Sequence, residues 1–166
     1  MLKRTFLLLL VVLITGCGFK LRGMMDMPAW LNNIAIVVQD AHRDMGTMLK
    51  DQFQAYGVRI ISDPTKADYL LLIINDANQQ QITSISASTT PRQYQLTYTV
   101  RYSLVKVKTK GSTEASVPPT TNTVSVSRQL TVNNDRILGS DAEGLMTYTE
   151  MRREAVMQII NRLSRK

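Results

Sequence analysis

The chain has a single cysteine, Cys17, and its position indicates a chemical role. It ends the segment LITGC, which follows an apolar run over residues 6–14 and a positive pair, Lys3 and Arg4. The run is too short to cross a bilayer as a helix, and with its positive flank it is typical of a secretion signal. A cysteine directly after a small residue at the end of such a signal is the acceptor of lipid in bacterial lipoproteins. The pattern therefore predicts removal of residues 1–16 and acylation of Cys17.

The residue after the cysteine indicates whether the lipoprotein is sorted to the inner or to the outer membrane. Gly18 stands where an aspartate would retain a lipoprotein at the inner membrane of many Gram-negative bacteria. We therefore expect attachment to the outer membrane, on its periplasmic side, through several acyl chains, since one chain alone holds only weakly. The alternatives are a signal with an incidental cysteine and an uncleaved anchor helix.

Groups suited to catalysis are scarce in this sequence. His42 is the only histidine, and no serine motif lies near it. Histidine, cysteine and carboxylate residues are not spaced as metal ligands, and there is no glycine-rich phosphate loop. The sequence predicts a protein that works by binding, without enzymatic activity, metal or cofactor.

The charge balance suggests what kind of partner the protein binds. The whole chain carries +7, and loss of Lys3 and Arg4 leaves about +5. Export makes nucleic acid an improbable partner, whereas phosphorylated glycolipids and anionic headgroups of the envelope attract basic residues. The alternative is that these residues only keep a membrane-proximal domain soluble.

The first half of the mature chain predicts one helix beside one strand. Residues 33–38 read as a strand, and residues 43–56 as an amphipathic helix that Asp40 or Asp44 caps and Gly57 terminates. Apolar residues recur at helical spacing at Met45, Met48, Leu49, Phe53 and Tyr56.

The second half predicts longer strands. Residues 69–74 form a continuous apolar run, as in a strand buried on both faces, and the polar residues 78–90 continue it into a hairpin loop. Residues 94–104 alternate strictly between apolar and polar, and the register slips after Leu104, where we expect a β-bulge. Beyond a hairpin tip at 109–123, a last strand begins at Val124 and the final helix spans about 141–165.

This order of elements favours an α+β fold. We expect a two-layer sandwich in which two helices pack on one face of a four- or five-stranded mixed sheet. Residues 17–32 would form the lipidated tether, and residues 33–166 a single domain without internal repeats.

The segment GCGFKLRG at residues 16–23 resembles the start of the LPS-assembly lipoproteins of the LptE family. That family has Gly-Cys-Gly followed by an aromatic residue, a basic residue or histidine, leucine and arginine. Further similarity lies at Tyr56-Gly57-Val58, at residues 94–97 and in the final helix. The resemblance implies a protein that plugs the lumen of the LptD β-barrel, assists its assembly, and supports transport of lipopolysaccharide to the outer leaflet.

The resemblance also implies contact with lipopolysaccharide through basic groups in two regions. Here these regions offer Arg92, before the long alternating strand, and Arg136, after the last strand. Guanidinium groups bind phosphate bidentately, which makes both residues candidates; the alternative for each, which the sequence favours, is a solvated loop charge.

A third candidate, Arg128, is in phase with Val126 and Leu130 on the expected apolar face. It could reach a sheet edge, face the barrel, or extend its charged head to solvent as a structural residue. Two further groups are candidates for contact with the barrel. The first is Lys106, Lys108 and Lys110, whose alternative role is to protect an edge strand. The second is Met24, Met25 and Met27, for which the alternative is a disordered tether.

Two functions from different classes remain open. The first is the barrel plug, which suits the Ser-, Thr- and Gln-rich strand residues 78–99, because a porin-like lumen is polar. The second is a free periplasm-facing lipoprotein that binds peptidoglycan or a small ligand. It would need a cell-wall-binding surface or an apolar pocket, and the sequence has no recognisable cell-wall motif.

Overall fold

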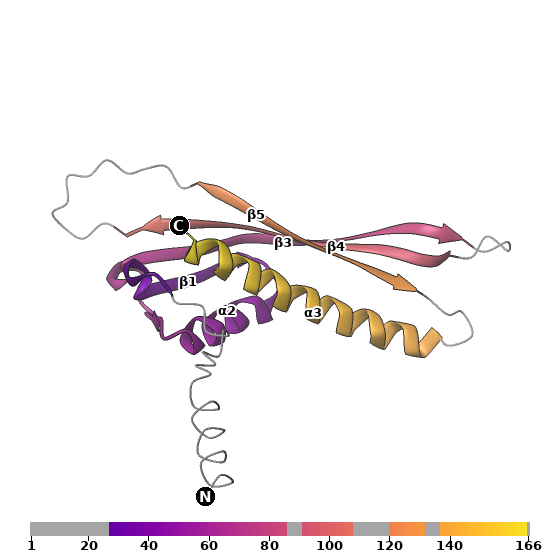
Figure 1. Cartoon of the computed structure of the whole chain (residues 1–166), viewed down its shortest axis with the longest axis horizontal. Coiled ribbons are helices and arrows are strands. Elements are labelled where there is room, and N and C mark those ends of the chain that lie inside the picture. Colours follow the sequence, from indigo (N-terminus) through magenta and orange to yellow (C-terminus); the bar gives the residue numbers. More distant parts are fainter. Residues whose placement is uncertain (1–26, 86–90, 108–119, 132–136, 166) are drawn as a thin grey trace, which may run out of the picture.

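The computed structural model describes residues 27–85, 91–107, 120–131 and 137–165. Its elements are the short 3-10 helix η1 (Ala29–Leu31), β1 (Asn33–Asp40), α2 (Arg43–Ala55), β2 (Arg59–Ile60), the 3-10 helix η2 (Pro64–Lys66), β3 (Tyr69–Ile85), β4 (Pro91–Lys106), β5 (Thr121–Thr131) and α3 (Ile137–Ser164). The strands form one sheet in the order β2-β1-β3-β4-β5. β1 runs parallel to β2 and β3, and the pairs β3–β4 and β4–β5 are antiparallel. Both helices lie on the same side of this mixed sheet (Figure 1), which confirms the expected α+β class.

Helix α2 forms where the apolar spacing predicts it. Met45, Leu49 and Phe53 face the sheet and are fully buried. The helix is followed by Gly57 with φ of 78°, a left-handed conformation that glycine adopts without steric cost. The cap predicted at Asp40 or Asp44 is wrong. His42 occupies the N-cap, and its Nδ1 accepts a hydrogen bond of 3.3 Å from the backbone N–H of Asp44.

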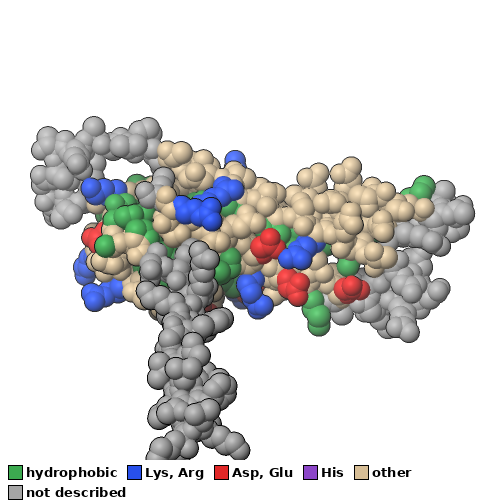
Figure 2. All heavy atoms as spheres, in the orientation of Figure 1, with side chains coloured by type: hydrophobic (Ala, Val, Ile, Leu, Met, Phe, Trp, Pro, Cys, Tyr) green, Lys and Arg blue, Asp and Glu red, His purple; other side chains and the backbone are tan. Residues whose placement is uncertain are grey.

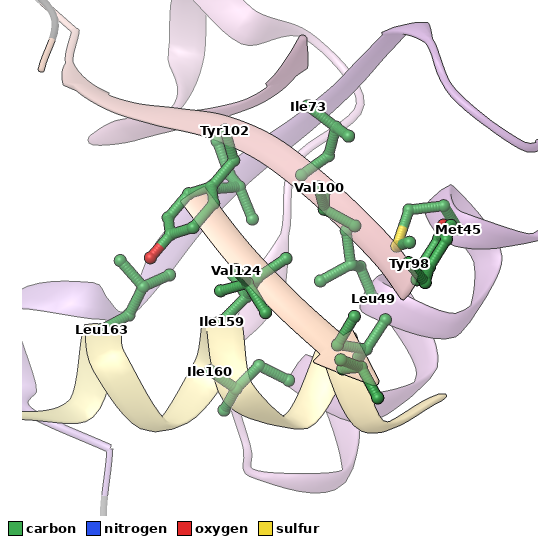
Figure 3. Packing of buried hydrophobic residues seen from close by; sticks show 14 of the residues in the cluster. Met45, Leu49, Ile73, Tyr98, Val100, Tyr102, Val124, Ile159, Ile160 and Leu163 are labelled. Atoms are coloured by element: carbon green, nitrogen blue, oxygen red, sulfur yellow. The ribbon is translucent and has the colours of Figure 1, made fainter. Parts of the chain in front are cut away.

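The hydrophobic core lies between the helices and the inner face of the sheet. The alternating residues of β4 confirm the predicted period: Leu96, Tyr98, Val100 and Tyr102 are buried. They meet Val124 of β5 and the α3 residues Ile159, Ile160 and Leu163, as Figure 3 shows. The predicted last strand and final helix are thus present, with α3 beginning at Ile137, before the expected residue 141.

The predicted β-bulge after Leu104 is wrong. Val105 and Leu104 pair in unbroken register with Leu70 and Leu71. The register instead shifts in β3, between Ile73 and Asn75. β3 thus has an extra residue, Ile74, opposite β4, and the residues of β3 from Asn75 to Ile82 change face, up to further register shifts between Ile82 and Ile85.

The apolar run at the start of β3 is buried on one face rather than on both. Leu71 and Ile73 are fully buried against the helices, whereas Leu70, Leu72 and Ile74 are half-buried on the face that carries no helix. Beyond these residues β3 continues to Ile85, so the polar stretch is indeed the far end of the same strand. β3 and β4 therefore extend past α2, and only α3 lies beneath their far halves (Figure 1).

Candidate functional site

The structure describes some of the predicted site residues and not others. Cys17 and Arg136 lie outside it, as do Lys108 and Lys110. Arg92 is the second residue of β4, but its side chain lies outside the described part. The lipidation of Cys17 and a ligand role for Arg92 and Arg136 therefore stay predictions.

Arg128 is described, and it has a structural partner. Its Nη2 donates a hydrogen bond of 2.6 Å to Oε2 of Glu154 on α3. Its side chain is 50% exposed, so the aliphatic part follows the inner face while the guanidinium reaches the helix surface. This geometry agrees with a structural arginine that extends its charge to solvent. The guanidinium still has N–H groups to offer a ligand, because it holds five N–H donors and this contact uses one.

The helix-free side of the sheet carries rows of hydrogen-bonding side chains. Because Leu96, Tyr98 and Val100 point to the core, the residues between them point away from both helices. The strand register aligns four rows, here called the polar face: Asn75, Arg101 and Thr123; Ala77, Thr99 and Ser125; Gln79, Thr97 and Ser127; Gln81, Gln95 and Gln129. Arg101 is the only charged residue in these rows.

Neighbouring side chains of the polar face hold one another in place. The hydroxyl oxygens of Thr97 and Ser127 lie 3.3 Å apart, and those of Thr99 and Ser125 lie 3.4 Å apart. The Nε of Arg101 donates to Oδ1 of Asn75 over 2.6 Å. In Figure 2 the surface over the far halves of β3 and β4 is almost wholly tan, whereas red and blue charged side chains gather nearer the helices.

A second polar group lies on the inner side of the sheet, where the shift in β3 turns Asp76 toward the helices. Oδ2 of Asp76 accepts hydrogen bonds from the Tyr98 hydroxyl at 2.6 Å and from the backbone N–H of His42 at 3.1 Å. Burial, and then the hydrogen bond to Asp76, raise the pKa of Tyr98 well above its ordinary range. Asp76 thus ties β4 to the start of α2.

Arg152 of α3 lies close to this group and is only 9% exposed. Its Nη2 is 3.4 Å from the Thr149 hydroxyl and its Nη1 is 4.0 Å from Oδ2 of Asp44. Its Nε has no hydrogen-bond partner among the described residues. A buried guanidinium beside a carboxylate favours a fixed position of α3 over α2, since moving either helix would leave a charge unpaired.

The described residues contain no group of three or more histidine, cysteine, aspartate or glutamate residues that could hold a metal ion. Across the same ranges, no helix is long and apolar enough to span a membrane. The sequence pointed to the polar face through its Ser-, Thr- and Gln-rich strand. It gave no sign of the Asp76 group, because a single acidic residue after an apolar run does not reveal which way it faces.

These features define a class: small α+β proteins with two helices on one face of a mixed sheet. Solved structures share the fold. The chain is similar to an uncharacterized lipoprotein B from Nitrosomonas europaea, with a TM-score of 0.67 and 24% identity over 89% of this chain and 90% of that one. It is also similar to a rare lipoprotein B from Shewanella oneidensis, with a TM-score of 0.66 and 15% identity over 80% and 93% of the two chains.

The sequence comparisons narrow this class to one family. The family model LptE, described as lipopolysaccharide-assembly, matches residues 31–163, and the chain belongs to this family. A relative from Pectobacterium atrosepticum, named LPS-assembly lipoprotein LptE, is 29% identical over 96% of this chain and 83% of its own length. A protein of the same name from Photorhabdus laumondii is 28% identical over 96% of this chain and 84% of its own length. The family resemblance inferred from the sequence is thus confirmed.

Proposed function

We propose that this protein is an outer-membrane lipoprotein, anchored by lipid on Cys17, that plugs the lumen of the LptD β-barrel. In this position it assists assembly of the barrel and supports transport of lipopolysaccharide to the outer leaflet. Its role is one of binding rather than catalysis. The observation that carries the proposal is the match to the LptE family over residues 31–163. This range includes every strand, all of α2, and α3 up to its last residue but one.

Physical features of the chain support the same role. A plug inside a polar lumen needs a surface that forms hydrogen bonds, and the polar face supplies amide and hydroxyl groups on three adjacent strands. A plug must also stay folded while a large partner assembles around it. The core shared by α2, α3 and the sheet favours this stability.

Contact with lipopolysaccharide is the finer part of the proposal. Arg92, Arg136 and Arg128 are the residues we assign to it, because guanidinium groups bind the phosphates of this glycolipid bidentately. The mature chain keeps a net charge of about +5 after loss of Lys3 and Arg4, which adds long-range attraction for the same anion.

The test is a pull-down of the tagged, lipidated protein from detergent-solubilised outer membranes, with the bound material identified by mass spectrometry. We expect one large barrel protein in stoichiometric amount. Recovery of the lipoprotein alone, or with fragments of peptidoglycan, would contradict the plug role and favour a free periplasm-facing lipoprotein.

A further inference from the structure

Aromatic and basic side chains gather at the end of the sheet where β1 and β3 begin and β4 ends (Figure 1). The indole of Trp30 on η1 meets the ring of Tyr69 edge to face, with the ring centroids 4.9 Å apart. The strand register places Lys106 opposite Tyr69, and Lys66 lies on η2, shortly before Tyr69. Arg59 of β2 lies beside the start of β1. These five residues are called the near end, and Figure 2 shows green and blue side chains next to one another there, on the left of the view.

We infer that the near end lies on the anionic headgroups of the membrane that holds the lipid anchor. The protein would then contact the bilayer with its folded domain as well as with its acyl chains. This inference rests on the proposed lipidation of Cys17, and it does not depend on the plug function.

The first argument is the reach of the tether. Between Cys17 and Met27, ten peptide units span at most about 36 Å, and Met27 leads directly into η1. The other end of β3, at Ile85, lies about 50 Å from Tyr69 along the strand. The near end is therefore the part of the domain held closest to the membrane. A short tether maintains an effective concentration on the order of millimolar, so a weak affinity for the surface is enough to keep it in contact.

The second argument is the position of the aromatic pair. Leu31 is fully buried and holds η1 on the core, whereas Trp30 and Tyr69 are only half-buried. Tryptophan and tyrosine are enriched at membrane–water interfaces, because their rings sit among the headgroups while the N–H and O–H groups stay hydrated. The pair thus offers an interfacial surface where the chain leaves toward the anchor.

The third argument is charge. Arg59, Lys66 and Lys106 are exposed, and the acidic residues nearest to them in the sequence and the register are Asp63 and Asp68. Asp68 already accepts a hydrogen bond of 2.8 Å from a side-chain amide, and Asp63 lies 3.6 Å from the Nζ of Lys66. An exposed ion pair of this kind is weak, so Lys66 is able to turn toward a lipid phosphate. The excess of cations over carboxylates favours an anionic surface.

Fluorescence of the lipidated, full-length protein in vesicles tests the contact, because Trp30 is the only tryptophan of the chain. The vesicles contain phosphatidylcholine brominated close to the headgroup, either alone or mixed with an equal amount of phosphatidylglycerol. Bromine quenches an indole that touches the lipid. We expect Trp30 to lose roughly half of its emission in the anionic vesicles and much less in the neutral ones.

A matched variant moves the fluorophore away from the near end. Trp30→Phe combined with Gln129→Trp keeps an aromatic ring against Tyr69 and places the only tryptophan at an exposed position near the end of β5. We expect its emission to be the same in both kinds of vesicle. Quenching equal to that of the parent would overturn the inference, because the contact would not be specific to the near end.

Flotation of the vesicles separates failure of the contact from failure of the anchor. If the protein floats with the vesicles and Trp30 is not quenched, the anchor stands and the contact is overturned. If the lipidated protein does not float, the anchor fails and the inference falls with it. The plug function is tested by recovery of the barrel and is not affected by either outcome.

Removal of single charges tests the role of the headgroups. Arg59→Gln takes one cation from the near end, and Arg153→Gln takes one from an exposed position on α3. The quenching gives the ratio of contacting to free domain, which we expect Arg59→Gln to lower roughly fivefold and Arg153→Gln to leave unchanged. Both side chains are exposed, so both variants should melt within a few degrees of the parent. Equal quenching of the two variants would contradict attraction by the headgroups.

Discussion

Tyr98 is the residue whose chemistry depends most on the fold. It lies on β4 with only 1% of its surface exposed, and its hydroxyl donates to Asp76, which also accepts from the start of α2. One side chain thus links the centre of the sheet to the position of a helix. A hydrogen bond to a charged acceptor contributes about 1.5–3 kcal/mol when it is buried.

The pKa of Tyr98, raised first by burial and then by this hydrogen bond, predicts a dependence of stability on pH. The folded-state pKa of Tyr98 is raised, so the folded protein keeps the phenol proton at a pH where the unfolded chain loses it. The contribution of Tyr98 to stability is therefore constant below about pH 10 and falls above it, by up to about 1.4 kcal/mol per pH unit. Denaturant unfolding between pH 8 and 11 should show a smaller fall for Tyr98→Phe. Some fall will remain, because burial also raises the pKa of Tyr102.

Tyr94→Phe, on the same face of the same strand, is the control for that experiment. It removes a phenol without touching Asp76 and should keep the slope of the parent protein. An identical slope for Tyr98→Phe and the parent above pH 10 would show that burial and the hydrogen bond to Asp76 do not raise the pKa of Tyr98 in solution.

Arg128 poses a different question, because its partner and its proposed ligand compete for one guanidinium. A half-exposed ion pair contributes only about 0–1 kcal/mol, so Arg128→Ala and Glu154→Ala should each lower the unfolding free energy by less than about 1 kcal/mol. Their effects on lipopolysaccharide should differ. We expect Arg128→Ala to weaken binding of purified lipopolysaccharide to the protein, and Glu154→Ala to preserve or strengthen it, because the latter frees the cation.

Binding measured by titration calorimetry decides the point. Equal affinity of the parent and Arg128→Ala would restrict Arg128 to its structural contact with α3. Arg92 and Arg136 would then be the remaining candidates for the ligand.

At the scale of elements, substitution by alanine should have opposite effects on stability at two glycines. Gly57 follows α2 with φ of 78°, so Gly57→Ala should destabilise the protein by about 1 kcal/mol, although nothing lies within 4 Å of the new Cβ. Gly144 lies within α3, and its Cβ would meet Leu130 at an ordinary 3.9 Å. Gly144→Ala should therefore stabilise the protein by up to about 1 kcal/mol through helix propensity. Thermal unfolding shows whether each variant is more or less stable than the parent. A higher stability of Gly57→Ala would contradict the left-handed turn.

The sequence predicts helices and strands more reliably than the bulges within strands and the caps of helices. β4 and α2 each bury one face. The order of apolar residues along the sequence therefore shows the two-residue period of β4 and the helical period of α2. The bulge is different. Val105 breaks the apolar alternation of β4, yet the extra residue lies in β3, where a run of apolar residues conceals any change of face. The cap at His42 was missed because histidine rarely caps a helix.

The candidate site was predictable to a similar degree. The richness of residues 78–99 in Ser, Thr and Gln indicates a hydrogen-bonding surface, but only the strand register shows that three strands share it. The Asp76 and Arg152 contacts depend on distances between remote segments, which no local pattern encodes.

At the scale of the whole molecule, the two sides of the sheet have different tasks. The helix side holds the core and pairs its charges with partners from the same chain, as Arg128 does with Glu154. The other side is neutral and hydrogen-bonding over its far half. The charged contacts that hold the fold together are thus separated from a face that offers mainly hydroxyl and amide groups.

The anchor itself gives the last prediction. Between Cys17 and Met27, the first described residue, ten peptide units span at most about 36 Å, so acylation of Cys17 keeps the folded part within that distance of the membrane. Cys17→Ser removes the thiol that accepts lipid. We expect it to abolish metabolic labelling with radioactive palmitate and to leave residues 1–16 attached, which mass spectrometry detects. Thr15→Ser keeps the cysteine and should be labelled like the parent, whereas palmitate on the Cys17→Ser protein would place the lipid elsewhere and remove the basis for this limit on its reach.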